Sequence, residues 1–381
     1  MESAVKTFND GRLASTGRLP SVLKTITRPP RRVSDALYML THWETWDWRI
    51  KYIVIAPAWF WCCLRARSLW FFTAANPTLT FGGFDGERKQ DMYSHLPPGT
   101  YPRSIYVSRG MDFASVADAL KDTITFPLAV KPDVGKMGFM FRALNSTEEL
   151  KSYHLRADFD YIIQQLIGYP LEVSVFYYRF PDEEKGHITG FVKKEYLQVT
   201  GDGKSTLREL IANCSRARFR QEEMYAKHVD QLHRVLRQGE VYALSQALNL
   251  SRGGKLVSLE HEKDERLLNV FDGLSHDAGF YFGRYDIRCE SVESLKQGKN
   301  FSILEFNGSG AEPHHVYGNA YTFWQACRIL VWHWNILCRI SRMNARRGVD
   351  YWDFIRGWRF FRECVKHSAK LEKLDCRTPE T

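Results

Sequence analysis

Residues 301–310 read FSILEFNGSG, and they follow a second largely apolar stretch, GRYDIR, at residues 283–288. Both stretches are typical of β-strands that carry polar side chains among apolar ones. Side chains at i and i+2 of a strand share a face, so Glu305 and Asn307 are predicted to point the same way. If the neighbouring strand places Asp286 opposite them, three oxygen donors converge, as in many Mg²⁺ sites. Buried carboxylates rarely occur without such a partner.

A strand followed by a glycine-bearing loop comes earlier, in FPLAVKPDVGKMGFMF at residues 126–141. The strand is predicted to end at Lys131, and Gly135, Lys136 and Gly138 lie in the loop. Glycine allows backbone N–H groups to approach phosphate oxygens closely, and the two lysines add positive charge. An ordinary hairpin turn with two glycines is the alternative interpretation.

Polar side chains also follow the buried run YIIQQLI at residues 161–167. The amides of Gln164 and Gln165 could read an adenine edge, and Glu172, which opens the next strand, could accept both ribose hydroxyls. Edge-strand polarity without a ligand is the alternative. Further along, GDGKSTLRELI at residues 201–211 predicts a tight turn and then a helix that begins with a capping box.

Composition restricts the class of protein. The chain has 381 residues, of which 44% are apolar, so it can bury a sizeable core and is not disordered over most of its length. Eight cysteines without a Cys-x-x-Cys motif indicate a reducing compartment rather than a disulfide scaffold or a zinc site. The net charge of +9 indicates an anionic partner, for which nucleotide, nucleic acid and lipid headgroup all qualify.

Both ends of the chain combine aromatic and basic residues. Residues 1–35 are predicted to form a basic flexible tail, with a phosphate- or headgroup-contacting arm as the alternative. Residues 52–64, YIVIAPAWFWCCL, are too short to span a bilayer, so they form either a buried helix, which we favour, or an interfacial segment. Residues 321–361 are predicted to be helical. One hypothesis is that both ends form a membrane-docking face; helices packed on a domain are the alternative.

The order of these motifs resembles the ATP-grasp family, which includes D-alanine–D-alanine ligase, glutathione synthetase and cyanophycin synthetase. The resemblance covers about residues 126–313, half of the chain. It implies an α+β fold in which two α+β subdomains grip a nucleotide. The expected division is a tail at 1–35, a helical, aromatic-rich N-terminal region at 36–122, a lid subdomain at 123–180, a metal-binding catalytic subdomain at 181–320 and C-terminal helices at 321–381.

The resemblance also implies roles for individual residues. Lys131 would contact the α- and β-phosphates, the loop with Gly135, Lys136 and Gly138 would form a lid over the γ-phosphate, and Arg284 would steady the acyl-phosphate and tetrahedral states. Lys193, Lys194 and Arg252 are candidates for a further phosphate contact, and NLSRGG at residues 249–254 is similar to a segment of the cyanophycin synthetase branch. The adenine hinge would comprise Gln164, Gln165, Leu166 and Ile167, the ribose-binding acid would be Glu172, and the Mg²⁺ ligands would be Asp286, Glu305 and Asn307.

The implied function is an ATP-dependent carboxylate–amine ligase that uses ATP and Mg²⁺ and forms an amide through an acyl phosphate. The glycine-rich segment at residues 73–89 either lines the acceptor side or only connects elements, and at most one of His314 and His315 is expected to face substrate. The alternatives are an ATP-grasp phosphotransferase or kinase, and a non-catalytic basic protein that binds a membrane or, less readily, nucleic acid. The expected location is the cytoplasm, with peripheral attachment to the inner membrane face as an extension of the docking hypothesis.

Overall fold

The structure is a computed structural model that describes residues 42–244 and 254–376. The chain forms two compact units, residues 1–47 and 48–381, and each is considered by itself. Of the first unit only residues 42–47 are described, and they contain the 3₁₀ helix η2 (Trp43–Thr45). The predicted basic tail, Arg252 and the NLSRGG segment apart from Gly254 lie outside the described residues.

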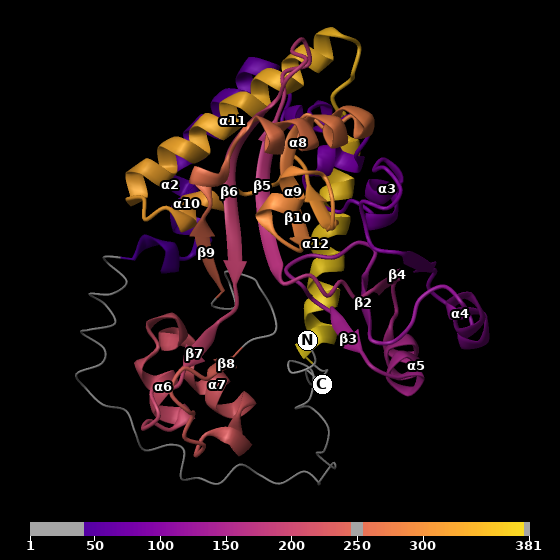
Figure 1. Ribbon diagram of the computed structural model, residues 1–381. Coiled ribbons are helices and arrows are strands. Elements are labelled where there is room, and N and C mark those ends of the chain that lie inside the picture. The colour runs from indigo at the N-terminus through magenta and orange to yellow at the C-terminus, as the bar shows by residue number, and fades with distance from the viewer. Residues whose placement is uncertain (1–41, 245–253, 377–381) are drawn as a thin grey trace. The chain divides into compact units, whose positions relative to one another are not determined.

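A five-stranded antiparallel sheet forms the centre of the second unit (Figure 1). Its strand order is β11-β10-β5-β6-β9. One face packs on α8 and α9, and the other face packs on α11, because apolar side chains alternate along β5 and β10. The strands are β5 (Leu171–Tyr178), β6 (His187–Glu195), β9 (Lys255–Ser258), β10 (Phe282–Cys289) and β11 (Phe301–Asn307).

A four-stranded antiparallel sheet has the order β1-β4-β2-β3 and its own apolar core. Its helix α5 begins where the side chain of Ser146 accepts a hydrogen bond from the backbone of Glu149, which is a normal N-cap. The elements are β1 (Ser104–Val107), α4 (Phe113–Leu120), β2 (Leu128–Pro132), β3 (Arg142–Leu144), α5 (Thr147–Arg156) and β4 (Tyr161–Gln165).

A third and smaller group of short helices and strands lies between β6 and β9 in the sequence and has its own apolar core. The predicted turn and helix are confirmed here, since Thr206 and Glu209 form a capping box at the start of α6. The elements are β7 (Gln198–Thr200), α6 (Leu207–Asn213), η5 (Ser215–Arg220), α7 (Gln221–Lys227), η6 (Val229–Gln231) and β8 (Val241–Ala243).

Helices from both ends of the second unit pack together through a cluster rich in aromatic rings. Helix α2 (Trp48–Ala66) lies beside α11 (Phe323–Arg346), and α12 (Phe354–Cys376) runs from this cluster to the core of the four-stranded sheet (Figure 1). The predicted helical C-terminal region is therefore confirmed. The remaining elements are η3 (Phe71–Ala74), η4 (Thr80–Gly83), α3 (Lys89–Ser94), η8 (Glu260–Glu262), α8 (Glu265–Ala278), α9 (Val292–Lys296) and α10 (His315–Gly318).

The mixture of helices with antiparallel sheets confirms the predicted α+β class. The two large sheets, however, each contain strands from both sides of a predicted subdomain limit, at residue 123 or at residue 180. Strand β1 precedes residue 123 yet pairs with β4, and β5 precedes residue 180 yet pairs with β6 and β10. Strand pairing depends on contacts between distant segments, so composition along the chain could not locate these limits.

Candidate active site

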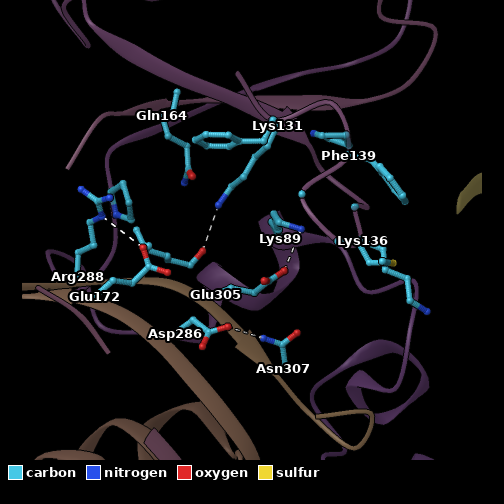
Figure 2. A pocket seen from close by; sticks show the side chains of 18 of the residues that line it. Lys89, Lys131, Lys136, Phe139, Gln164, Glu172, Asp286, Arg288, Glu305 and Asn307 are labelled. Atoms are coloured by element: carbon cyan, nitrogen blue, oxygen red, sulfur yellow. Dashed lines mark hydrogen bonds and ion pairs between the residues drawn. The ribbon is translucent and has the colours of Figure 1, made fainter. Parts of the chain in front are cut away.

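A cavity of about 460 Å³ is lined by residues of both large sheets and of the segment before α3 (Figure 2). Twelve of the residues to which the sequence assigned a role in the site line it, whereas Arg284 does not. The structure therefore brings the sequence motifs together. The predicted residues in its lining are Lys131, Gly135, Lys136, Gly138, Gln164, Gln165, Leu166, Ile167, Glu172, Asp286, Glu305 and Asn307.

The predicted acidic set lies on two adjacent strands. Asp286 of β10 is directly opposite Glu305 of β11 in the register, and the Asn307 side-chain amide donates to Asp286 Oδ2 at 3.3 Å. Figure 2 shows these three side chains on the same side of the cavity. The convergence that the strand alternation predicted is therefore present.

Asp286 is held by cations. Arg284 donates to both of its carboxylate oxygens, at 3.1 and 3.0 Å, and Lys194 Nζ lies 3.1 Å from Oδ1. Burial acts to raise the pKa of Asp286, but Arg284 and Lys194 outweigh it and hold that pKa well below its usual range. Asp286 is consequently an anion at neutral pH.

Glu305 faces the cavity more openly, with 36% of its side chain exposed, and its carboxylate pairs with Lys89 Nζ at 3.2 Å. Burial opposes ionisation here too, yet Lys89 and Lys131 lower the pKa of Glu305. The cavity thus contains two adjacent carboxylates that are charged and are balanced by lysines.

The chemistry of these donors suits Mg²⁺. In the described residues there is no cluster of three His, Cys, Asp or Glu side chains able to hold a metal alone. Mg²⁺ usually takes one or two carboxylates and completes its octahedron with water and substrate phosphates. Asp286, Glu305 and the Asn307 amide oxygen would supply part of such an octahedron. The remaining positions would be filled by water and by phosphate oxygens of a substrate.

Lys131 lies near the end of β2, as predicted, and its ammonium group donates to the Leu304 carbonyl at 3.1 Å and lies 3.4 Å from the Tyr93 hydroxyl. Burial, reinforced by the charge of Lys89, lowers the pKa of Lys131 to about 7. A lysine with such a pKa is only partly charged near neutral pH. It gains a full charge when an anion binds beside it.

The loop after β2 is tied to other elements. Asp133 accepts hydrogen bonds from Arg88 and from the backbone of Gln90, and Lys136 pairs with Asp85 at 2.7 Å. Helix α12 contributes a further bond, from His367 to the Val134 carbonyl. The loop predicted to form a lid is therefore anchored at several points.

The predicted base and ribose residues lie at another part of the cavity lining. The Gln164 side chain is buried and donates to Ser104 at 2.6 Å, whereas Gln165 follows it at the end of β4. Glu172 pairs with Lys194 at 3.2 Å and with Arg288 at 3.5 Å. Its carboxylate is thus positioned in the cavity by two cations.

Arg284 lies behind Asp286 and does not line the cavity; its Nη1 donates to the Glu312 carbonyl at 2.8 Å. Its contacts are those of a group that positions Asp286, and direct contact with a reacting acyl group remains a prediction. The histidines that follow, His314 and His315, do not line the cavity either.

Sequence reasoning did not identify Arg288, included Lys89 only as the last residue of the segment at residues 73–89, and left Lys194 undecided against Lys193. Lys194 lines the cavity, while Lys193 pairs with Glu195. Arg288 could have been found from the sequence. It lies two residues after Asp286 and four after Arg284 on the same predicted strand, so the three side chains share a face. Lys89 had no such signal, since α3 joins the site only through tertiary packing.

Comparison with solved structures finds enzymes of the kind that the motifs resemble. The chain is similar to a bifunctional glutathione synthetase from Pasteurella multocida, with 12% identity and a TM-score of 0.40 over 64% of this chain. It is also similar to D-alanine–D-alanine ligase from Bacillus anthracis, with 15% identity and a TM-score of 0.37 over 68% of this chain and 67% of that one. A third match is the ATP-grasp ligase PsnB complexed with minimal precursor, with 13% identity and a TM-score of 0.35 over 65% of this chain and 59% of that one.

The chain covers 35% of the length of the glutathione synthetase. No protein-family model matches the chain, and no curated protein sequence matches it. The likeness is one of fold, so the function depends on the side chains of this chain's own cavity.

Proposed function

We propose that the protein is an ATP-dependent ligase of the ATP-grasp type that joins a carboxylate to an amine through an acyl phosphate. The observation that supports it most is the facing pair Asp286 and Glu305 in a cavity that also contains Lys89, Lys131 and Lys194. A magnesium–triphosphate group carries both a cation and anionic oxygens, and this cavity offers partners for both.

The nucleotide would bind along the predicted residues. Gln165, Leu166 and Ile167 would contact the base, Glu172 the ribose, and Lys131 the phosphates. Asp286, Glu305 and Asn307 would hold Mg²⁺, which when bound offsets phosphate charge during phosphoryl transfer. Exclusion of water by the loop after β2 would protect the acyl phosphate from hydrolysis.

The chemistry in this proposal has two steps. A substrate carboxylate oxygen attacks the γ-phosphorus of ATP, the bond to ADP breaks, and an acyl phosphate forms. The amine then attacks the acyl carbon, phosphate leaves with the C–O electron pair, and the nitrogen loses its proton. Positioning and charge neutralisation supply most of the catalysis, so no covalent enzyme intermediate is needed.

Two carboxylates mark an acceptor end of the cavity. Asp85 and Glu87 belong to the segment at residues 73–89 that was predicted either to line the acceptor side or to connect elements, and both line the cavity. Asp85 already holds a primary ammonium group, that of Lys136. Glu87 Oε2 is buried without a hydrogen-bond partner among the described residues, and burial, with the nearby charge of Glu305, raises the pKa of Glu87 to about 8. A carboxyl group with that pKa is suited to take the proton of an ammonium nucleophile.

The direct test is ADP release measured against panels of carboxylates and amines, with mass spectrometry of the products. The expected product is an amide formed together with phosphate, and hydroxylamine should trap the acyl phosphate as a hydroxamate. A phosphorylated acceptor without an amide would identify a phosphotransferase instead. Insensitivity of the protein to ATP and Mg²⁺ would contradict both enzymes.

Nucleotide binding should take up a proton. Since the pKa of Lys131 is about 7 and should rise beside phosphates, binding at pH 8 is expected to take up about one proton, and binding at pH 6 much less. Calorimetry with a non-hydrolysable ATP analogue in buffers of different ionisation enthalpy measures this number. Lys131→Met should remove the uptake and weaken binding, whereas Lys204→Met, at an exposed lysine, should leave both unchanged. Equal uptake in wild type and Lys131→Met would contradict the assignment.

Loss of the carboxylates at the acceptor end should affect the amine selectively. Asp85→Asn is expected to raise the KM for the amine about tenfold or more, because a charge-assisted hydrogen bond is lost. Glu87→Gln is expected to lower kcat about tenfold or more, because the proton acceptor is lost, and in both variants the KM for ATP should stay within about twofold. Asp118→Asn, at an exposed carboxylate on α4, is the control. A larger change in the KM for ATP than in that for the amine would place these carboxylates with the nucleotide.

A further inference from the structure

Helix α2 exposes a continuous stripe of apolar side chains on one face. The stripe recurs every three or four residues, which is the spacing of a single helix face. The opposite face of the same helix is buried, with Cys62 and Cys63 in the aromatic cluster. The favoured interpretation of residues 52–64 as a buried helix therefore holds for one face, and the other face is exposed. The exposed fractions are 53% for Ile50, 72% for Ile53, 42% for Val54, 61% for Phe60, 58% for Trp61 and 70% for Leu64.

Helix α11 extends this apolar surface. Trp324 and Trp332 are 67% and 47% exposed, and they line a groove of about 900 Å³ together with Val54, Pro57 and Ala58 of α2. We define the docking face as the exposed stripe of α2 together with Trp324 and Trp332. Contiguous apolar patches of this kind on a protein surface usually mark an interaction site.

The charge of the two helices selects an anionic partner. Helix α2 contains three Lys or Arg residues and α11 contains four, and neither helix contains an Asp or Glu. One of these arginines, Arg328, lines the groove itself. Tryptophan rings flanked by arginines are typical of proteins that sit at the headgroup level of anionic bilayers.

The same charge argues against two other occupants. A second copy of the chain would bring an equally cationic pair of helices against this one, so the two faces would repel. Residues 1–41 contain seven Lys or Arg and three Asp or Glu, so that segment is itself basic and would also be repelled by the docking face.

Within residues 42–244 and 254–376, no helix combines the length and apolarity that crossing a membrane would require.

We propose that α2 and α11 dock the protein on an anionic lipid surface, with Phe60, Trp61 and Leu64 inserted at the headgroup boundary and Arg65 and Arg328 facing the lipid phosphates. This inference is independent of the reaction proposed above, because none of these residues lines the cavity between the sheets.

The test is sedimentation of the full chain with vesicles of phosphatidylcholine alone and with roughly a third phosphatidylglycerol. The protein is expected to bind the anionic vesicles, and this binding should weaken as salt is added. When the lipids carry brominated chains, binding should quench tryptophan emission. Phe60→Ser/Trp61→Ser/Leu64→Ser should lower binding about tenfold or more. Leu155→Ser/Val229→Ser/Val241→Ser removes equally exposed apolar side chains elsewhere and should bind as the wild type does.

The role of charge is tested separately with the double variant Arg65→Gln/Arg328→Gln, which should bind anionic vesicles roughly tenfold or more weakly than the wild type at low salt. The double variant Arg109→Gln/Arg156→Gln is the matched control and should bind as the wild type does. The proposal would be overturned if the wild type did not bind anionic vesicles, or if the Phe60/Trp61/Leu64 and Leu155/Val229/Val241 triple variants bound them equally well. A concentration-dependent dimer that dissociates in the Phe60/Trp61/Leu64 variant would assign the face to a second copy and also overturn it. Circular dichroism of every variant shows whether the fold is retained.

Discussion

Glu305→Gln is expected to reduce Mg²⁺-dependent ADP formation by on the order of a hundred- to a thousandfold while leaving the protein folded. The substitution removes one of the two anionic donors that face the cavity. Glu305 is partly exposed, but its partner Lys89 is buried, so the substitution should lower the free energy of unfolding by about 1 kcal/mol, well below the loss expected for Asp286→Asn. The measurement is ADP formation as a function of Mg²⁺ concentration, together with the unfolding midpoint.

Nucleotide binding without metal supplies the second readout. Lys89 loses its carboxylate partner in Glu305→Gln, so metal-free nucleotide should bind at least as tightly as to the wild type. Glu290→Gln is the control, since Glu290 is an exposed carboxylate directly after the same sheet strand β10. An unchanged dependence on Mg²⁺ would show that Glu305 is not a metal ligand.

Local sequence periodicity accounts for the part of the site that was predictable. The alternation along β10 and β11 fixed which side chains share a face, and the register then placed Asp286 opposite Glu305. The loop after Lys131 and the end of β4 were recognised because glycines and glutamines interrupt apolar runs. All of these signals lie within a few residues of the side chains that they identified.

The remainder of the site depends on packing between distant segments. Lys89 reaches Glu305 because α3 packs on the five-stranded sheet through Met92 and Tyr93. Nothing near Lys89 in the sequence distinguishes it from other lysines at the start of a helix. The anchoring of the loop after β2 by α12 is likewise a contact between residues far apart in the chain.

Helix α2 shows why composition alone left two interpretations open. Residues 53–64 of this helix are apolar on every side, so no periodicity in the sequence separates a core face from a surface face. Only the packing of Cys62 and Cys63 against α11 determines which side is covered. The same feature that obscured the prediction supports the docking proposal.

Asp286→Asn should abolish turnover and also destabilise the protein, in contrast to Glu305→Gln. Asp286 is buried and pairs with Arg284 and Lys194, so neutralising it leaves two cations without their shared anion. Breaking a buried ion pair from one side typically costs about 3–5 kcal/mol. Chemical unfolding at pH 7 measures this loss, and the ADP assay measures turnover.

The pH dependence and a second substitution separate the two effects of Asp286→Asn. Because the cations lower the pKa of Asp286, its pairing stabilises the fold above the unfolded pKa of about 4 and is lost as pH falls toward the lower folded pKa. The variant should therefore lose less stability than the wild type between about pH 5 and pH 3. Adding Lys194→Met removes one of the two cations that faced Asp286, at the cost of its pair with Glu172, so the double variant should regain only about 1 kcal/mol without regaining turnover. Recovery of turnover in the double variant would mean that Asp286 is needed only to neutralise the charge of Lys194. An unchanged free energy of unfolding in Asp286→Asn would mean that the buried ion pairs are not formed in solution.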